Sequence, residues 1–214
     1  MAAVALGRDF AFQVSAQDYC TTGVDAVDVL SGGLPRGCLT EICGPASSGR
    51  TSLMLAALAQ ATGREESCAL VDASDAFDPV SAAAWGVALE RVLWVRCGGH
   101  AEHALKATDL LVQGGGFGLV VMDLGDTPVA TARRISMTSW FRLRRAVEHT
   151  PTILLVVNQQ PQAKTCASLL LAMRRAQAAW TGAAGCSRLL RGIRVRVERH
   201  KPAPAKESLF IAQW

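Results

Sequence analysis

The chain has 214 residues, half of them hydrophobic, and a net charge of +4 at pH 7, which suits one well-buried α/β domain and argues against long disorder. Its longest apolar runs, FGLVVM and TILLVV, are too short to cross a bilayer, and its N-terminus lacks the basic start and apolar core of a secretory signal. Seven scattered cysteines without a C-x-x-C pair fit reduced thiols, so we expect a cytoplasmic protein with no membrane partner.

Hydrophobic periodicity predicts alternating strands and helices along most of the chain. Strands rich in apolar residues are expected at 38–43, 67–73, 91–96, 117–123 and 152–158. The helices expected between them lie at 51–61, near 79–87, at 101–113 and from about 129 to 148. Strands that alternate with helices of this length form βαβ units, so the sequence predicts an α/β fold with a mostly parallel central sheet flanked by helices.

The alternation changes in the C-terminal part. The segment 167–180 is ambiguous, because its composition favours a helix and its place in the series favours a strand. In GIRVRVERH, apolar residues at 193, 195 and 197 alternate with charged ones, which predicts a strand with one buried and one charged face. The segment 207–214 has the composition of a closing strand. We therefore expect antiparallel strands at the C-terminal end of the sheet.

The stretch GPASSGRT, residues 44–51, is the most informative motif. It follows a predicted strand, opens a predicted helix and has the spacing G-x-x-x-x-G-K-S/T of a phosphate-binding loop, with Arg50 in place of lysine. In such a loop, backbone N–H groups surround the β-phosphate, and the helix adds its positive N-terminus. Arginine keeps the charge but is longer and planar, so it is not interchangeable with lysine there. The alternative is a Gly/Ser-rich turn before a helix.

A metal site would accompany this loop. Thr51 would place its hydroxyl on Mg²⁺, and Asp123 ends the apolar run LVVMD as an acidic residue on the metal side should. The residues of the loop and its flank that we expect to hold ATP with Mg²⁺ are Gly44, Ser47, Ser48, Gly49, Arg50, Thr51, Ser52 and Asp123.

Several segments in order resemble the core domain of the RecA family of DNA-recombination ATPases. Residues 22–53 resemble its start, 68–79 its second strand and following loop, and 196–214 its closing hairpin. Asn158 and Gln159 sit where the family carries a nucleotide-sensing Asn-Gln pair. The resemblance implies a RecA-like P-loop core, ATP and Mg²⁺ as cofactors, and a nucleotide site that includes these two residues. It implies a single core domain at 21–214, preceded by an N-terminal extension at 1–20 without a full filament module.

The departures from the family concern catalysis. Active members carry a glutamate in the loop after the second strand, which activates the attacking water, and Ser74 stands there in this chain. A serine cannot act as a general base near neutral pH, and replacing the lysine by Arg50 alters charge stabilisation. We therefore expect no meaningful hydrolysis, no catalytic residue and weakened nucleotide binding. The alternative is an active DNA-dependent ATPase of the recombinase type.

A shortened RecA-like chain with an altered ATP site resembles the ImuA-type accessory proteins of bacterial mutagenesis cassettes, and residues 168–197 are similar to a segment of those proteins. The resemblance implies an accessory role in DNA repair by translesion synthesis during the SOS response. The implied partners are an ImuB-like polymerase-family protein and an error-prone replicative-type polymerase. The segments where the family has its DNA-binding loops, near 124–131 and 159–168, are short. Neither filament formation nor strand exchange is therefore expected, and the oligomeric state stays open.

The charge is divided unevenly along the chain. Through residue 130 there are 7 Lys and Arg against 15 Asp and Glu, and from Thr131 onward there are 15 against 3. This second part would meet DNA, an acidic protein partner, or the acidic part of its own domain. Guanidinium groups bind phosphates in bidentate fashion. The residues expected to contact DNA or a partner are Arg133, Arg134, Arg142, Arg145, Arg174, Arg175, Arg194 and Arg196. The first four are expected in one helix, with positions 134, 142 and 145 near one face.

Overall fold

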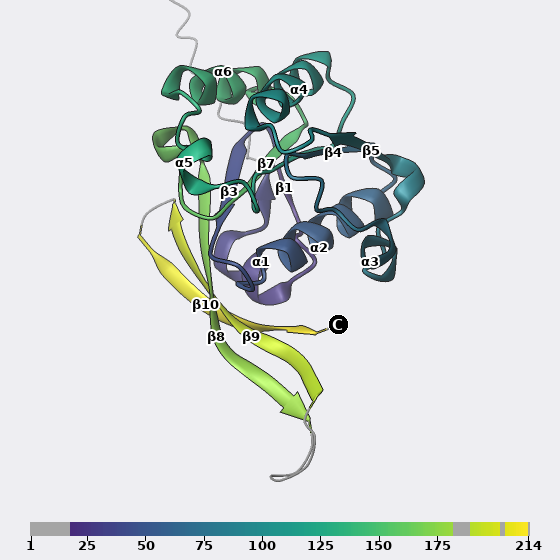
Figure 1. The fold of residues 1–214 in the computed structure, drawn as a ribbon, viewed down its shortest axis with the longest axis vertical. Coiled ribbons are helices and arrows are strands. Elements are labelled where there is room, and N and C mark those ends of the chain that lie inside the picture. Colours follow the sequence, from purple (N-terminus) through teal and green to yellow (C-terminus); the bar gives the residue numbers. More distant parts are fainter. Residues whose placement is uncertain (1–17, 182–188, 202–203, 214) are drawn as a thin grey trace, which may run out of the picture.

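The computed structural model describes residues 18–181, 189–201 and 204–213. These residues form one eight-stranded sheet in the order β10–β9–β8–β3–β7–β6–β4–β5, with a separate two-stranded β1–β2 pair (Figure 1). The neighbouring strands from β8 to β5 run parallel, whereas β9 and β10 are antiparallel to their neighbours. The predicted α/β class, with a mostly parallel sheet and antiparallel strands at the C-terminal end, is confirmed.

The strands of the parallel part are short, and all of them except the edge strand β5 are almost wholly buried. They are β3 Leu39–Cys43, β4 Cys68–Asp72, β5 Val92–Arg96, β6 Leu119–Asp123 and β7 Ile153–Asn158. The C-terminal strands are longer: β8 Leu169–Thr181, β9 Leu189–Lys201 and β10 Lys206–Gln213. In Figure 1 the β8–β9 pair extends well beyond the helices. The small pair joins β1 Tyr19–Cys20 to β2 Leu34–Pro35. The domain division at residue 20 stays a prediction.

Helices cover both faces of the sheet. They are α1 Asp25–Ser31, α2 Arg50–Gly63, α3 Pro79–Ala84, α4 Ala101–Gly114, α5 Val129–Ala132 and α6 Met137–Val147, with 3₁₀ turns at Leu89–Arg91 and Lys164–Cys166. One apolar core joins α1, α2 and α3 to the sheet, and a second joins α4 and α6 to its other face. Because successive strand residues point to opposite faces, each parallel strand contributes to both cores. No helix in the described part of the chain is both long and apolar enough to cross a bilayer.

The single helix predicted from about 129 to 148 is wrong. Two helices, α5 and α6, stand there with a turn between them. The reason is local: Ser136 has an extended backbone and its hydroxyl accepts a hydrogen bond from Ser139 N at 3.1 Å, so it caps a new helix. Arg133 and Arg134 therefore lie in the turn and do not share a helix face with Arg142 and Arg145.

The ambiguous segment 167–180 is a strand. It forms most of β8, which pairs with β3 on one side and with β9 on the other. Hydrogen bonding to two neighbours thus overrides a composition that favours a helix. The predicted alternation in β9 is confirmed where its side chains are described, since Val195 and Val197 are buried and Arg194 and Arg196 are exposed. The side chain of Ile193 lies outside the described residues.

Candidate nucleotide and nucleic-acid site

The phosphate-binding loop connects β3 to α2 at the carboxyl edge of the sheet. Gly44 begins it with no room for a side chain, because a Cβ there would lie 2.4 Å from Met173 O and 2.5 Å from Ser48 Oγ. Gly49 ends it with φ +87°, a conformation that favours glycine. Ser48 is fully buried, and its hydroxyl has no hydrogen-bond partner among the described residues. A glycine-lined loop with an unsatisfied buried hydroxyl at a helix N-terminus fits a phosphate group.

Arg50 does not point freely from this loop. Its guanidinium is buried and donates from Nη1 to Gly44 O at 2.5 Å. Nη2 donates to Gly125 O at 2.6 Å and to Asp126 Oδ1 at 3.0 Å. The side chain therefore connects the start of the loop to the segment that follows β6.

Asp123 ends β6 close to this guanidinium. Its Oδ1 accepts a hydrogen bond from Gly125 N at 2.7 Å. Burial raises the pKa of the Asp123 carboxyl to about 6, with the nearby carboxylates of Asp72 and Asp126 acting in the same direction and Arg50 opposing them. Thr51 is exposed at the start of α2. Hydroxyl and carboxylate oxygens are the ligands that Mg²⁺ prefers, so Thr51 and Asp123 would hold a magnesium ion, which would offset negative charge on a bound nucleotide.

The loop after β4 holds Ser74 in place of the glutamate. Asp72, at the end of β4, accepts hydrogen bonds from the backbone N–H groups of Ser74, Ala76 and Phe77 at 2.9–3.2 Å. Asp75 accepts from Gly98 N and pairs with Arg96 at 3.1 Å. Both carboxylates near Ser74 therefore serve to fix the loop.

The predicted Asn-Gln pair lies at the end of β7, next to β3. Asn158 N–H groups donate to the buried carboxylate of Glu41 at 2.8 Å, and the backbone oxygen of Asn158 accepts from Gly44 N at 3.1 Å. Glu41 also accepts from the backbone N–H groups of Gln162 and Ala163. Burial raises the pKa of Glu41 despite these donors. The arrangement fixes the segment that carries Gln159 to the strand that carries the phosphate-binding loop.

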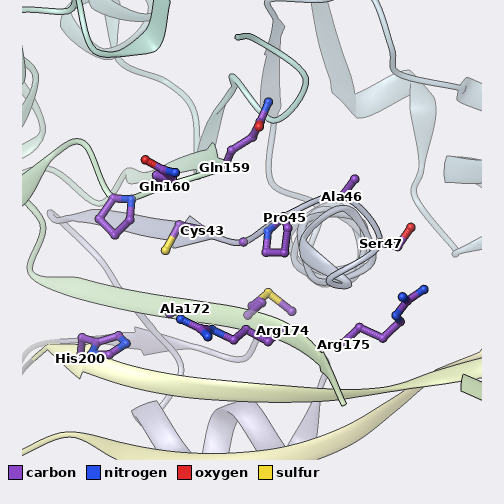
Figure 2. A pocket seen from close by; sticks show the side chains of 13 residues that line it. Cys43, Pro45, Ala46, Ser47, Gln159, Gln160, Ala172, Arg174, Arg175 and His200 are labelled. Atoms are coloured by element: carbon purple, nitrogen blue, oxygen red, sulfur yellow. The ribbon is translucent and has the colours of Figure 1, made fainter. Parts of the chain in front are cut away.

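A cleft of about 850 Å³ opens beside the loop (Figure 2). Its lining comes from the loop, the end of β7, β8 and β9, namely Cys43, Gly44, Pro45, Ala46, Ser47, Gln159, Gln160, Pro161, Ala172, Met173, Arg174, Arg175 and His200. Figure 2 shows Arg174 extending toward His200 and Arg175 toward the Ser47 end of the loop. Two arginines and two glutamine amides on a concave surface suit a negatively charged ligand.

The predicted arginines separate into two groups in space. Arg174 lies directly opposite Arg196 in the β8–β9 pairing, and Arg194 follows on the same exposed face, so like charges gather there. Arg133 joins this region, because its Nη2 donates to Gln160 Oε1 at 2.8 Å on the rim of the cleft. Arg142 instead pairs with Asp109 of α4 at 3.1 Å. It lies on α6 together with Arg145, on the helical layer that packs against α4.

A second hollow, of about 450 Å³, lies beside Ser52 in the first turn of α2. Its lining residues are Gly23, Val24, Asp25, Ala26, Ser52, Trp85, Phe210 and Ile211. Apolar side chains next to the first turn of α2 suit the flat base of a nucleotide whose phosphates lie in the loop. The sequence offered no motif for this hollow, because its walls come from four distant segments.

Other contributors were also missed from the sequence. Asp126 was not predicted to belong to the site, although it binds Arg50. Glu41 is a buried polar residue in a strand that is otherwise mostly apolar, and it was not predicted to contribute. Asp126 stands three residues after Asp123, which was the one available signal. Glu41 gave a clearer one, since a carboxylate inside an apolar strand requires hydrogen-bond donors.

Comparison with known proteins places these features in a family context. Residues 2–165 match the family described as RecA N-terminal domain. The chain is 32% identical over 170 residues to "Protein RecA" of Ectopseudomonas oleovorans, and the alignment covers 72% of this chain and 48% of that protein. The chain thus spans about half the length of the curated relative that it matches.

Proposed function

This chain belongs to the RecA family, and we propose that it acts as a cytoplasmic accessory protein without ATP turnover, in bacterial DNA repair by translesion synthesis. In this role it binds an ImuB-like polymerase-family protein, beside an error-prone replicative-type polymerase, and contacts DNA through its arginines. Nucleotide serves as a bound ligand, and its hydrolysis does not drive the function.

The observation that carries the proposal is the state of the carboxylates around the phosphate-binding loop. Asp72 and Asp75 hold the loop that contains Ser74, Asp126 binds Arg50, and Asp123 stands where a metal-side acid belongs. A water molecule that attacks a γ-phosphate needs a positioned acceptor to orient it and take its proton. In the described part of the chain, none of these four carboxylates remains for that task.

The arginine face of β8 and β9 supports the second half of the proposal. Arg174 and Arg194 are exposed on one face of this strand pair and Arg175 on the other, and none of the three makes an ion pair within the described residues. Arginines held side by side on a rigid sheet repel one another unless an anion lies between them. A phosphodiester backbone, which places charges at regular short intervals, is the ligand that best relieves this repulsion.

The first test measures ATP turnover by the purified chain with Mg²⁺ and single-stranded DNA. We expect the wild-type rate to equal that of Thr51→Ala, because a site without a base gains nothing from an intact metal ligand. DNA-stimulated turnover that Thr51→Ala abolishes would instead establish the recombinase-type ATPase and end the accessory proposal.

The second test measures single-stranded DNA binding by fluorescence anisotropy over a range of salt concentrations. The variant Arg174→Ala/Arg175→Ala is expected to bind roughly tenfold more weakly, and its log K against log salt slope should fall by about 1.4, since each single-strand phosphate contact contributes about 0.7. Arg144→Ala, which removes an arginine already paired with Glu148 at 2.9 Å, is the matched control. Equal affinities and slopes for the double variant and the control would rule out DNA contact at β8.

A further inference from the structure

The guanidinium of Arg50 crosses the mouth of the phosphate-binding loop. Nη1 is bonded to Gly44 O at the start of the loop, and Nη2 is bonded to Gly125 O and Asp126 beyond β6. The residue is only 6% exposed, so protein atoms enclose this link on nearly all sides. Arginine reaches this far because its side chain is longer than that of lysine and ends in a planar group with several donors.

The position of this link matters because of the order in which phosphates occupy such a loop. The backbone cradle surrounds the β-phosphate, while the third phosphate lies beyond it, between the loop and the acidic residue at the end of another strand of the same sheet. The loop keeps features of a phosphate cradle, since Ser48 Oγ is buried without a partner among the described residues and Gly49 has the positive φ of +87° that shapes the turn into α2. The space beyond the cradle is the one that Arg50 crosses on its way to Gly125 and Asp126.

The charges around this space also act against a third phosphate. Asp126 keeps 62% of its side chain exposed at the rim, and Asp123 lies beside it at the end of β6. A third phosphate would bring further negative charge next to these carboxylates. The positive charge that would offset it is already shared with Asp126 and with two backbone carbonyls. Repulsion between like charges at such short range is strong where water is excluded.

We propose that the loop binds a nucleoside diphosphate in preference to the triphosphate, with the Arg50 guanidinium and the Asp126 carboxylate filling the place of the third phosphate. This inference rests on the proposed function, in which nucleotide is a ligand and not a fuel. It makes Arg50 and Asp126 residues that determine ligand specificity. The nucleotide site of the accessory protein then holds mainly diphosphate unless triphosphate exceeds diphosphate by more than the ratio of the two affinities.

Competition between unlabelled nucleotides for a bound fluorescent ADP, in one Mg²⁺-containing buffer, tests the proposal. The wild type is expected to bind ADP at least about tenfold more tightly than ATP. Arg50→Lys withdraws the guanidinium from Gly125 and Asp126, and Asp126→Asn removes the negative charge at the rim. Each should reduce the preference to about threefold or less. Arg144→Lys and Asp18→Asn, which change an arginine and an aspartate in surface pairs elsewhere, should keep the wild-type ratio.

Three results would overturn the proposal: equal affinities for ADP and ATP in the wild type, tighter binding of ATP, or no binding of either nucleotide. Asp126→Asn alters an exposed side chain, so it remains informative even if Arg50→Lys fails to fold. These outcomes leave the accessory role in DNA repair standing, although absence of binding would remove nucleotide as a ligand from it. ATP turnover by the wild type, followed in the same samples, is the separate result that would remove that function.

Discussion

The double variant Arg50→Lys/Ser74→Glu is expected to hydrolyse ATP at least about 100-fold faster than the wild type, because it restores two separate requirements of phosphoryl transfer. A positioned general base contributes about 10²–10⁴ in rate, and a correctly placed charge at the transferred phosphate contributes about 10²–10³. When only the base or only the charge is restored, the missing one still limits the rate of hydrolysis. Either single variant should therefore stay within about tenfold of the wild type.

The geometry of the loop after β4 favours this gain. Residue 74 is held in place by the hydrogen bonds that its own backbone N–H and those of Ala76 and Phe77 donate to Asp72, so a glutamate there would start from a fixed backbone. The control is Arg50→Lys/Ala76→Glu, which adds the same carboxylate two residues further along the same loop, at an exposed position. Phosphate release is measured with Mg²⁺ and single-stranded DNA. Equal rates for the double variant and this control would show that position 74 does not face the phosphates.

The parallel part of the fold follows closely from the sequence. Four of its strands, β3, β4, β6 and β7, are runs of five or six residues that are almost wholly buried on both faces, and such runs are visible as continuous apolar segments between turns. The errors come where local and distant interactions compete. Ser136 starts α6 through a single side-chain hydrogen bond, and β8 is a strand because β3 and β9 lie on either side of it. Neither fact is contained in the periodicity of the segment itself.

The site was predicted where spacing along the chain determines position. The glycines of the loop are fixed by the turn from β3 to α2, and Asp123 by the end of a buried strand. What the sequence could not provide is the direction of Arg50, because its partners Gly125 and Asp126 lie 75 and 76 residues away. Which arginines lie close together in space also depends on contacts between residues far apart in the sequence. Arg133 reaches the cleft through Gln160, while Arg142 is held by Asp109 on the opposite layer.

Gly44→Ala is expected to lower the free energy of unfolding by about 3 kcal/mol, the upper end of the usual cost of overpacking. The added methyl group would lie 2.4 Å from the backbone oxygen of Met173 in β8, and a backbone atom within a sheet cannot move aside as a side chain does. The relief available is a shift of β8 away from the loop. That shift would displace Arg174 and Arg175, which follow Met173 directly and line the cleft.

One substitution should therefore impair both halves of the proposed function. Urea denaturation measures the stability, and DNA anisotropy on protein that remains folded measures the displacement of the arginines. Gly63→Ala is the matched control, since a Cβ there meets nothing within 4 Å, and alanine at the last position of α2 should leave stability unchanged or raise it by up to about 1 kcal/mol. Loss of stability with unchanged DNA affinity would mean that the loop and the arginine face of β8 are structurally independent. Loss of both stability and DNA affinity would indicate that the loop and the arginines of β8 are coupled through the contact between Gly44 and the backbone of Met173. Nucleotide bound in the loop would then be able to change the position of these arginines.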